Sequence, residues 1–178
     1  TQMRSYGRAL RMPLLALTAS ASIVGGVFVA AQPAYSVDGV VGVGGQCLTA
    51  ADEGASIVVS SVVPVGSPLH VEGSGWGASS EASRGFVIVT LDDGQEVRPA
   101  GVTLPAWVPA AVARNKAAWS VAEVSTAGAF SADIELPSTW AVGSEHSIMI
   151  GDGVTGTYVQ VSVTVVEATA QAHVCSLT

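Results

Sequence analysis

The chain has 178 residues, of which fourteen are acidic and seven are basic, giving a formal net charge of −7. Three of the basic residues, Arg4, Arg8 and Arg11, lie at the N-terminus, so the chain beyond residue 36 carries four basic residues against fourteen acidic ones, a net charge of −10. A surface of this charge repels phosphate backbones, and nucleic acid is therefore not an expected partner. The length fits one domain with a substantial core.

The first 36 residues have the pattern of a signal peptide. The three arginines precede an apolar, uncharged run over residues 14–31, and small residues follow at Ala31 and Ser36, where signal peptidase could cleave. The alternative is an uncleaved membrane anchor, although a run of about eighteen residues is at the short limit for a bilayer. We therefore expect a protein that is secreted or associated with the cell envelope, and that meets the membrane only through this segment if the segment is retained.

The two cysteines, Cys47 and Cys175, flank most of the chain that remains after the signal segment. In an exported protein such a pair predicts a disulfide. In the chain-entropy model, closing a loop of about 127 residues stabilises the fold by roughly 4–5 kcal/mol. Two free thiols or a metal site are the alternative. However, the sequence has no C-x-x-C spacing, and the histidines at 70, 146 and 173 are scattered. We expect no metal.

Short apolar runs separated by turn residues dominate the rest of the sequence. They cover residues 56–63, 69–72, 85–91, 117–124, 129–136, 145–150 and 157–167. In 129–136 and 157–167 apolar and polar residues alternate, which is typical of antiparallel strands with one face on a core. Asp92, Asp93 and Gly94 predict a hairpin turn. The pattern predicts an all-β, immunoglobulin-like antiparallel sandwich, with a closed barrel as the alternative.

The predicted organisation therefore has four parts. A signal peptide, or an uncleaved helical anchor, covers residues 1–36. A flexible lead-in, rich in glycine and valine and containing Cys47, covers 37–55. The sandwich covers 56–167, and a C-terminal tail over 168–178 is tied back by Cys175.

The stretch GSGWGA at residues 73–78 resembles a dinucleotide-binding motif, since it follows one apolar run and precedes another that ends in Asp92 and Asp93. Such a motif requires a helix after its glycines to hold the pyrophosphate and to cross the sheet. The eight residues before Phe86 make only about two helical turns, roughly 12 Å. We therefore expect no cofactor. We interpret Gly73 and Gly75 as residues that let a strand bend, and Trp76 as a cap on the edge of the core.

Few residues suggest a chemical site. The carboxylates of Asp92, Asp93 and Glu96 could bind calcium, but a solvated hairpin tip explains them without a ligand. Serine is plentiful, yet there is no G-x-S-x-G elbow, and no histidine stands near a patterned acid. Paired acids for glycoside hydrolysis leave no mark in sequence spacing. We expect no catalytic residues.

Two of the four tryptophans, Trp107 and Trp140, fall in predicted loops and are candidate ligand contacts. Flat aromatic rings stack on sugars and on protein partners. The alternative is that these side chains belong to the core, as tryptophan usually does in a sandwich. Trp107, in a loop bounded by prolines, is the one most expected to be exposed.

Five stretches together resemble a known family of repeats. They read VEGSGWG (71–77), VIVTLDDGQ (87–95), AEVSTAGAFSADIELP (122–137), GSEHSIMI (143–150) and VQVSVTV (159–165). Their order is similar to that in immunoglobulin-like β-sandwich repeats of secreted and wall-attached actinobacterial surface proteins. The matching positions are Trp119, Gly128, Phe130, Ile134, Leu136, Pro137 and His146. The resemblance implies a fold and no catalytic residues.

The expected function is that of an exported, non-catalytic module at the bacterial cell envelope. Its role would be structural, adhesive or partner-binding, with a protein or a cell-wall polysaccharide as the partner. The first alternative is a carbohydrate-binding module that uses exposed Trp107 and Trp140. The second is a secreted hydrolase.

Overall fold

The computed structural model of the chain describes residues 36–37, 45–170 and 174–177. The signal segment predicted for 1–36 lies outside the described residues, apart from its last one. The described residues all fall within one compact unit, Gln32–Thr178. Within them, no helix is both long and apolar enough to cross a membrane.

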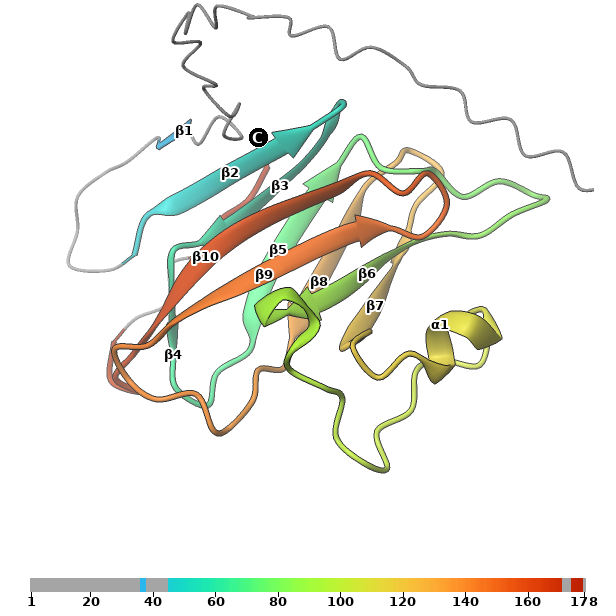
Figure 1. The fold of residues 1–178 in the computed structure, drawn as a ribbon. Coiled ribbons are helices and arrows are strands. Elements are labelled where there is room, and N and C mark those ends of the chain that lie inside the picture. The colour runs from blue at the N-terminus through green and yellow to red at the C-terminus, as the bar shows by residue number, and fades with distance from the viewer. Residues whose placement is uncertain (1–35, 38–44, 171–173, 178) are drawn as a thin grey trace, which may run out of the picture. The chain divides into compact units, whose positions relative to one another are not determined.

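Strands make up nearly all of the regular structure, which confirms the all-β prediction. The strands are β1 (Ser36–Val37), β2 (Cys47–Asp52), β3 (Ala55–Ser60), β4 (Val62–Pro64), β5 (Leu69–Ser74), β6 (Gly85–Leu91), β7 (Ser120–Val124), β8 (Phe130–Ile134), β9 (Glu145–Asp152) and β10 (Tyr158–Val166). Two short helices, η1 (Asp92–Gly94) and α1 (Ala110–Arg114), lie between β6 and β7 (Figure 1).

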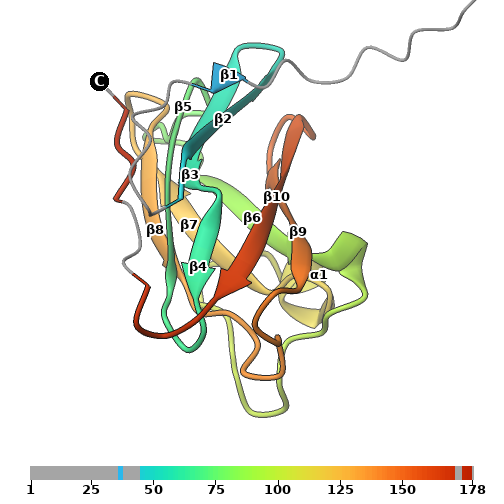
Figure 2. The ribbon, with the colours of Figure 1, turned by 90° about the vertical axis from the view of Figure 1, so that its left-hand side faces the viewer.

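The strands form two five-stranded sheets. One has the order β1-β2-β3-β5-β8 and the other β4-β10-β9-β6-β7. Neighbouring strands are antiparallel, except that β4 runs parallel to β10. Figure 2 shows the sheets as two layers, with β3, β5 and β8 in one and β6, β9 and β10 in the other. Two separate sheets replace the closed barrel that was the alternative.

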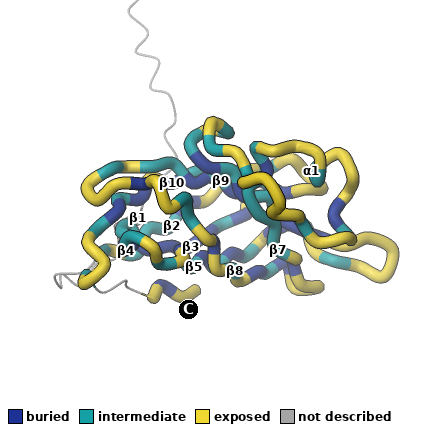
Figure 3. Tube along the Cα trace, turned by 90° about the horizontal axis from the view of Figure 1, so that it is seen from below, coloured by how far each residue is buried: buried dark blue, intermediate teal, exposed yellow. Residues whose placement is uncertain are grey.

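Both sheets contribute alternate side chains to one apolar core. On β10, the valines at 159, 161, 163 and 165 are buried, and polar or partly exposed residues lie between them, as the period-two pattern predicts. Figure 3 shows buried positions along the strands of both layers. Burying each such side chain contributes about 1.5–3 kcal/mol. The largest fully buried side chains are Ile57, Leu69, Leu91, Ile134, Ile148 and Ile150.

The run 56–63 was predicted as one strand, but it divides between the two sheets at Ser61. β3 pairs with β2 and β5 in the first sheet, and β4 pairs with β10 in the second. Ser61 lies at the crossing: its N–H donates to Gln46 O at 2.7 Å, and its carbonyl accepts from Thr164 N at 2.9 Å. The sequence hides this division because its apolar residues continue through the crossing.

The lead-in predicted for residues 37–55 needs correction, because β2 lies within it. Its six residues pair in register with β3, from Cys47 opposite Ser60 to Asp52 opposite Ala55. The two strands meet in a tight turn at Glu53 and Gly54, whose φ angles of 48° and 92° are positive. A hairpin therefore occupies part of the segment that its glycine and valine content suggested was flexible.

The turn around Trp76 has the mechanical role that the sequence suggested. Gly75 has a φ of +76°, and a Cβ there would overlap the carbonyl of Gly54. Trp76 is 4% exposed and donates from its indole nitrogen to Ser56 O at 2.9 Å. Its ring meets the Phe130 ring edge-on, with centroids 5.7 Å apart. Residues 77–84 form no helix, so these glycines serve close packing.

The hairpin turn predicted at Asp92–Gly94 is also corrected. These residues form η1, in which Asp92, Asp93 and Gly94 have positive φ angles of 47°, 54° and 83°. The chain then makes a long excursion, which includes α1, before it returns as β7 beside β6. The prolines in this excursion disfavour a direct return as a strand. Within the excursion, α1 is a short helix of five residues that begins directly after Pro109.

Candidate functional site

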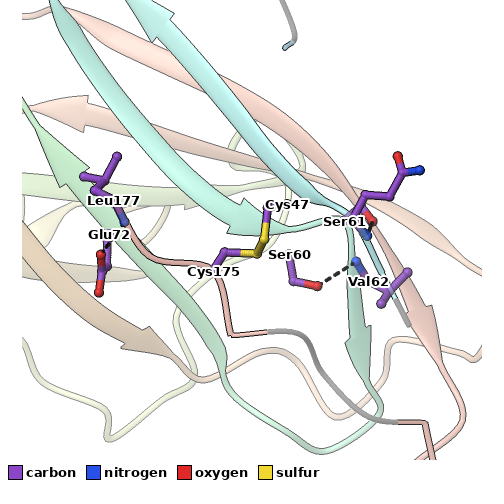
Figure 4. The surroundings of a disulfide bond; sticks show 8 residues. Cys47, Ser60, Ser61, Val62, Glu72, Cys175 and Leu177 are labelled. Atoms are coloured by element: carbon purple, nitrogen blue, oxygen red, sulfur yellow. Dashed lines mark hydrogen bonds between the residues drawn. A yellow bond between two sulfur atoms is a disulfide. The ribbon is translucent and has the colours of Figure 1, made fainter. Parts of the chain in front are cut away.

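Cys47 and Cys175 form the predicted disulfide, with their Cα atoms 5.6 Å apart. The bond lies on the outer face of its sheet, away from the core (Figure 4). On β3, Ile57 and Val59 belong to the core cluster, so the alternate residues Val58 and Ser60 point to the opposite face. Cys47 pairs directly with Ser60 and shares that outer face.

The C-terminal segment 174–177 crosses this outer face. Cys175 is bonded to Cys47 on β2, and the N–H of Leu177 donates to a carboxylate oxygen of Glu72 on β5 at 2.8 Å. Since β3 lies between β2 and β5, the segment must pass over β3. Val58 and Ser60, which lie on the same outer face of β3, are only 5% and 4% exposed. The tail tied back by Cys175 is therefore present.

The two tryptophans proposed as ligand contacts have different surroundings. Trp140 is 4% exposed and stacks on His146 with ring centroids 3.7 Å apart, so it offers no free face, and its prediction as an exposed contact is corrected. Trp107 is partly exposed. The Arg84 guanidinium lies 5.0 Å above its ring, and Phe86 meets it edge-on at 5.9 Å. Neighbouring side chains therefore already contact both rings.

A chain of hydrogen bonds that the sequence did not reveal joins Ser144, His146 and Asp92. Ser144 Oγ lies 2.7 Å from His146 Nε2, and His146 Nδ1 lies 2.8 Å from Asp92 Oδ2. The other Asp92 oxygen accepts from the N–H of Ser147 at 3.0 Å. This is the order of contacts in a Ser-His-Asp catalytic triad.

The single hydroxyl proton of Ser144 decides whether this chain of hydrogen bonds has a structural or a catalytic arrangement. Ser144 Oγ also lies 2.6 Å from the carbonyl oxygen of Ala141, and a hydroxyl has one proton to donate. If Ser144 donates to Ala141, it can only accept from His146, and the ring can then donate to both Ser144 and Asp92 only as the imidazolium. If Ser144 donates to His146, as a nucleophilic serine must, the bond to Ala141 is lost. With every bond made, Ser144 is not arranged as a nucleophile.

An open groove of about 790 Å³ lies beside this chain of hydrogen bonds. It is lined by Asp92, Asp93, Gln95, Glu96, Glu145, His146, Ser147 and Ser162. Acyl transfer requires hydrogen-bond donors or positive charge where the oxyanion develops, and carboxylates disfavour it. The nearby amides of Gly143 and Ser144 already donate to Val165 O and Ala141 O. The groove is thus better suited to a cationic or neutral polar surface than to a developing anion.

The three carboxylates considered for calcium each have a separate protein partner. Asp92 accepts from Ser147 N and contacts His146. Asp93 accepts from the side-chain amide of Gln160 at 2.9 Å, and Glu96 from the indole of Trp140 at 3.3 Å. Within the described residues, no group of three or more His, Cys, Asp and Glu side chains is arranged to hold a metal ion.

Two ionisable groups outside the groove have shifted pKa values. Asp152 is 7% exposed, and burial raises the pKa of its carboxyl, but hydrogen bonds from the backbone of Thr155, Val154 and Gly77 outweigh burial and leave the pKa below its ordinary value. On the outer face of the other sheet, the hydrogen bond to Asp133 raises the pKa of His70. Burial opposes this effect, and nearby Glu72 adds to it.

Comparison with known proteins identifies no relative from which a role could be transferred. No family model, no curated protein and no solved structure matches the chain. A function must therefore be inferred from the fold and from the contacts described above.

Proposed function

We propose that residues 47–166 form an immunoglobulin-like sandwich that acts as an exported, non-catalytic module at the bacterial cell envelope. Its role is structural, adhesive or partner-binding, and its partner is a protein or a cell-wall polysaccharide. The signal-like N-terminus and the disulfide support export, since disulfides persist in oxidising compartments.

The strand order is the observation that carries the fold part of this proposal. In immunoglobulin domains, strands A, B and E share one sheet and strands C, F and G share the other. Here β3, β5 and β8 correspond to A, B and E, whereas β6, β9 and β10 correspond to C, F and G. β4 continues β3 into the second sheet and pairs in parallel with β10, as a first strand that switches sheets would.

The contacts around the groove favour a non-catalytic role. Its carboxylates oppose an oxyanion, and the bond from Ser144 to Ala141 competes with donation to His146. Trp140 stacks on His146 and bonds to Glu96, which links the loop before β9 to the chain after η1. We interpret the Ser144–His146–Asp92 chain as a connection between loops.

Export and binding can be tested with the full chain expressed with its own N-terminus in an actinobacterial host. We expect the protein in the wall or medium fraction, shortened at or near residue 31 or 36 by intact mass, with both cysteines oxidised. We also expect it to sediment with isolated cell walls. A full-length, reduced protein in the cytosol would overturn the proposed location.

A secreted hydrolase is the second candidate, because Ser144, His146 and Asp92 have the order of contacts of a catalytic triad. A fluorophosphonate probe, which labels activated serines, distinguishes the two readings. The non-catalytic proposal expects no label on Ser144 in the folded protein and no turnover across ester and polysaccharide panels. Labelling that disappears in Ser144→Ala but persists in the neighbouring Ser147→Ala would establish a nucleophile and refute the non-catalytic role.

A further inference from the structure

We propose that the Cys47–Cys175 disulfide is a redox latch that holds residues 174–177 as a strap across β3. A dithiol reductant would open the latch, release the strap and uncover Val58 and Ser60, while the sandwich stays folded. The bond would then control access to one face of the module, in addition to joining two distant parts of the chain.

The position of the bond supports a latch. The core lies between the sheets and contains neither the disulfide nor Val58 and Ser60. All six residues of β2 also pair with β3, through the backbone and not through the sulfur atoms. Cutting the sulfur–sulfur bond therefore removes no core contact and no strand pairing.

The described contacts of the strap include a covalent anchor and an exposed hydrogen bond. The covalent anchor is the disulfide, and the hydrogen bond runs from the N–H of Leu177 to the carboxylate of the partly exposed Glu72. An exposed hydrogen bond of this kind contributes little against the conformational freedom that a released segment regains. We therefore expect loss of the covalent anchor to favour the released strap.

This behaviour also limits what the bond contributes to global stability. The chain-entropy treatment assumes that both cysteines stay fixed in the folded protein whether or not they are joined. If the reduced protein releases residue 175, its folded state gains entropy too, and the loss of stability is smaller than the loop length of 128 residues suggests. A latch and a global staple therefore predict different melting temperatures after reduction.

The chemistry of opening is ordinary thiol–disulfide exchange. Cys47 is partly exposed, whereas Cys175 is buried, so the incoming thiolate attacks Cys47 Sγ and displaces the Cys175 thiolate. The second thiol of the reductant, as its thiolate, then attacks the sulfur of the reductant in the mixed disulfide and releases Cys47 as a thiolate. The dithiol becomes a cyclic disulfide, and two electrons and two protons pass to the protein.

The surface that opens is small and defined. Val58 is its apolar centre, Ser60 and Thr49 supply hydroxyls, and Glu72 loses its contact with Leu177. His70 and Asp133 lie beside Glu72 on the same face of the sheet. Reduction would thus expose an apolar spot with an acidic border.

The test compares the oxidised full chain with the chain treated with dithiothreitol, and uses Cys175→Ser as the permanently open form. We expect Val58 methyl signals to become broadened by a soluble paramagnetic probe in both open forms, and carboxypeptidase to remove residues 174–178 only from them. The melting temperature should fall by no more than a few °C, compared with ~10 °C or more for a staple across this loop.

Glu72→Gln provides the matched control, since it weakens the second anchor and leaves the disulfide intact. Its strap should resist carboxypeptidase when oxidised and be digested when reduced. Cooperative loss of near-ultraviolet circular dichroism on reduction at room temperature would overturn the proposal, because the bond would then hold the fold. Unchanged protection of Val58 in both open forms would overturn it as well.

Discussion

The carboxylate of Asp152 offers the sharpest test of how this sandwich holds its turns. It lies at the end of β9 and accepts three backbone hydrogen bonds, from Gly77 at 2.6 Å, Val154 at 2.7 Å and Thr155 at 2.9 Å. One side chain therefore fixes the β9–β10 turn and joins it to the Trp76 loop, 75 residues earlier. Asp152→Ala removes the acceptor for all three donors.

The expected loss follows from how buried each donor is. The N–H of Gly77 is left in a part-buried site, where an orphaned donor costs about 1–3 kcal/mol. Val154 and Thr155 are exposed, so water can replace the carboxylate there, and we assign roughly 0.5–1 kcal/mol to each. The sum is about 3 kcal/mol, which for a domain of this size lowers the melting temperature by roughly 9 °C.

Urea unfolding and thermal melting of the full chain measure this loss. The free energy of unfolding of Asp152→Asn should lie between those of wild type and Asp152→Ala. Asparagine keeps one acceptor oxygen, but when that oxygen accepts from the turn, its amide N–H faces the N–H of Gly77. Asp52→Ala, at an exposed position on β2, is the matched control and should stay within about 0.5 kcal/mol of wild type. An Asp152→Ala midpoint equal to that of the control would refute this account of the turn.

Three further predictions concern other contacts. Gly75→Ala should lower the free energy of unfolding, measured with urea, by about 2 kcal/mol more than Gly143→Ala does. Both glycines have a positive φ, but only at Gly75 would a Cβ overlap the backbone. Equal losses would show that backbone strain alone decides the effect. Since the pKa of His70 is raised, its stabilisation is complete below its unfolded pKa of about 6.5 and disappears as pH rises through the folded value. His70→Gln should therefore flatten the stability–pH profile in that window, and an unchanged profile would contradict the assignment. Arg98 donates to the carbonyls of Val102, Ala113 and Ala118. Arg98→Lys should therefore speed amide hydrogen exchange in residues 99–118, while exchange in β5 and β10 stays unchanged. Equal acceleration in residues 99–118 and in both strands would mean that the excursion unfolds only together with the core.

The alternation of apolar and polar residues predicted the strands that have one face exposed to solvent. β8 and β10 lie within the predicted runs, because a period of two identifies both the strand and the face it buries. The division of residues 56–63 between two sheets could not be predicted, since the apolar residues continue on both sides of Ser61 and give no sign of a change of sheet. β2 was missed because a glycine-rich approach to Cys47 concealed a hairpin whose turn is made by Glu53 and Gly54.

The contacts around the groove could not have been found from the sequence. Asp92 and His146 are 54 residues apart, and they meet only because β6 and β9 are neighbours in the finished sheet. Ser144 is two residues from His146, but that spacing alone carries no signal for a triad. Conversely, a pair of cysteines in an exported chain was enough to predict the disulfide, since its chemistry requires no knowledge of the fold.

The place of the disulfide also determines how the module would respond to mechanical tension. A pull applied to the chain on both sides of Cys47 and Cys175 passes through the sulfur–sulfur bond, and the 128-residue loop that it closes bears no load. After cleavage of that bond, the same pull would act on β2 at one end and on β10 at the other, so the pairing of β2 with β3 and of β10 with β4 and β9 would carry it.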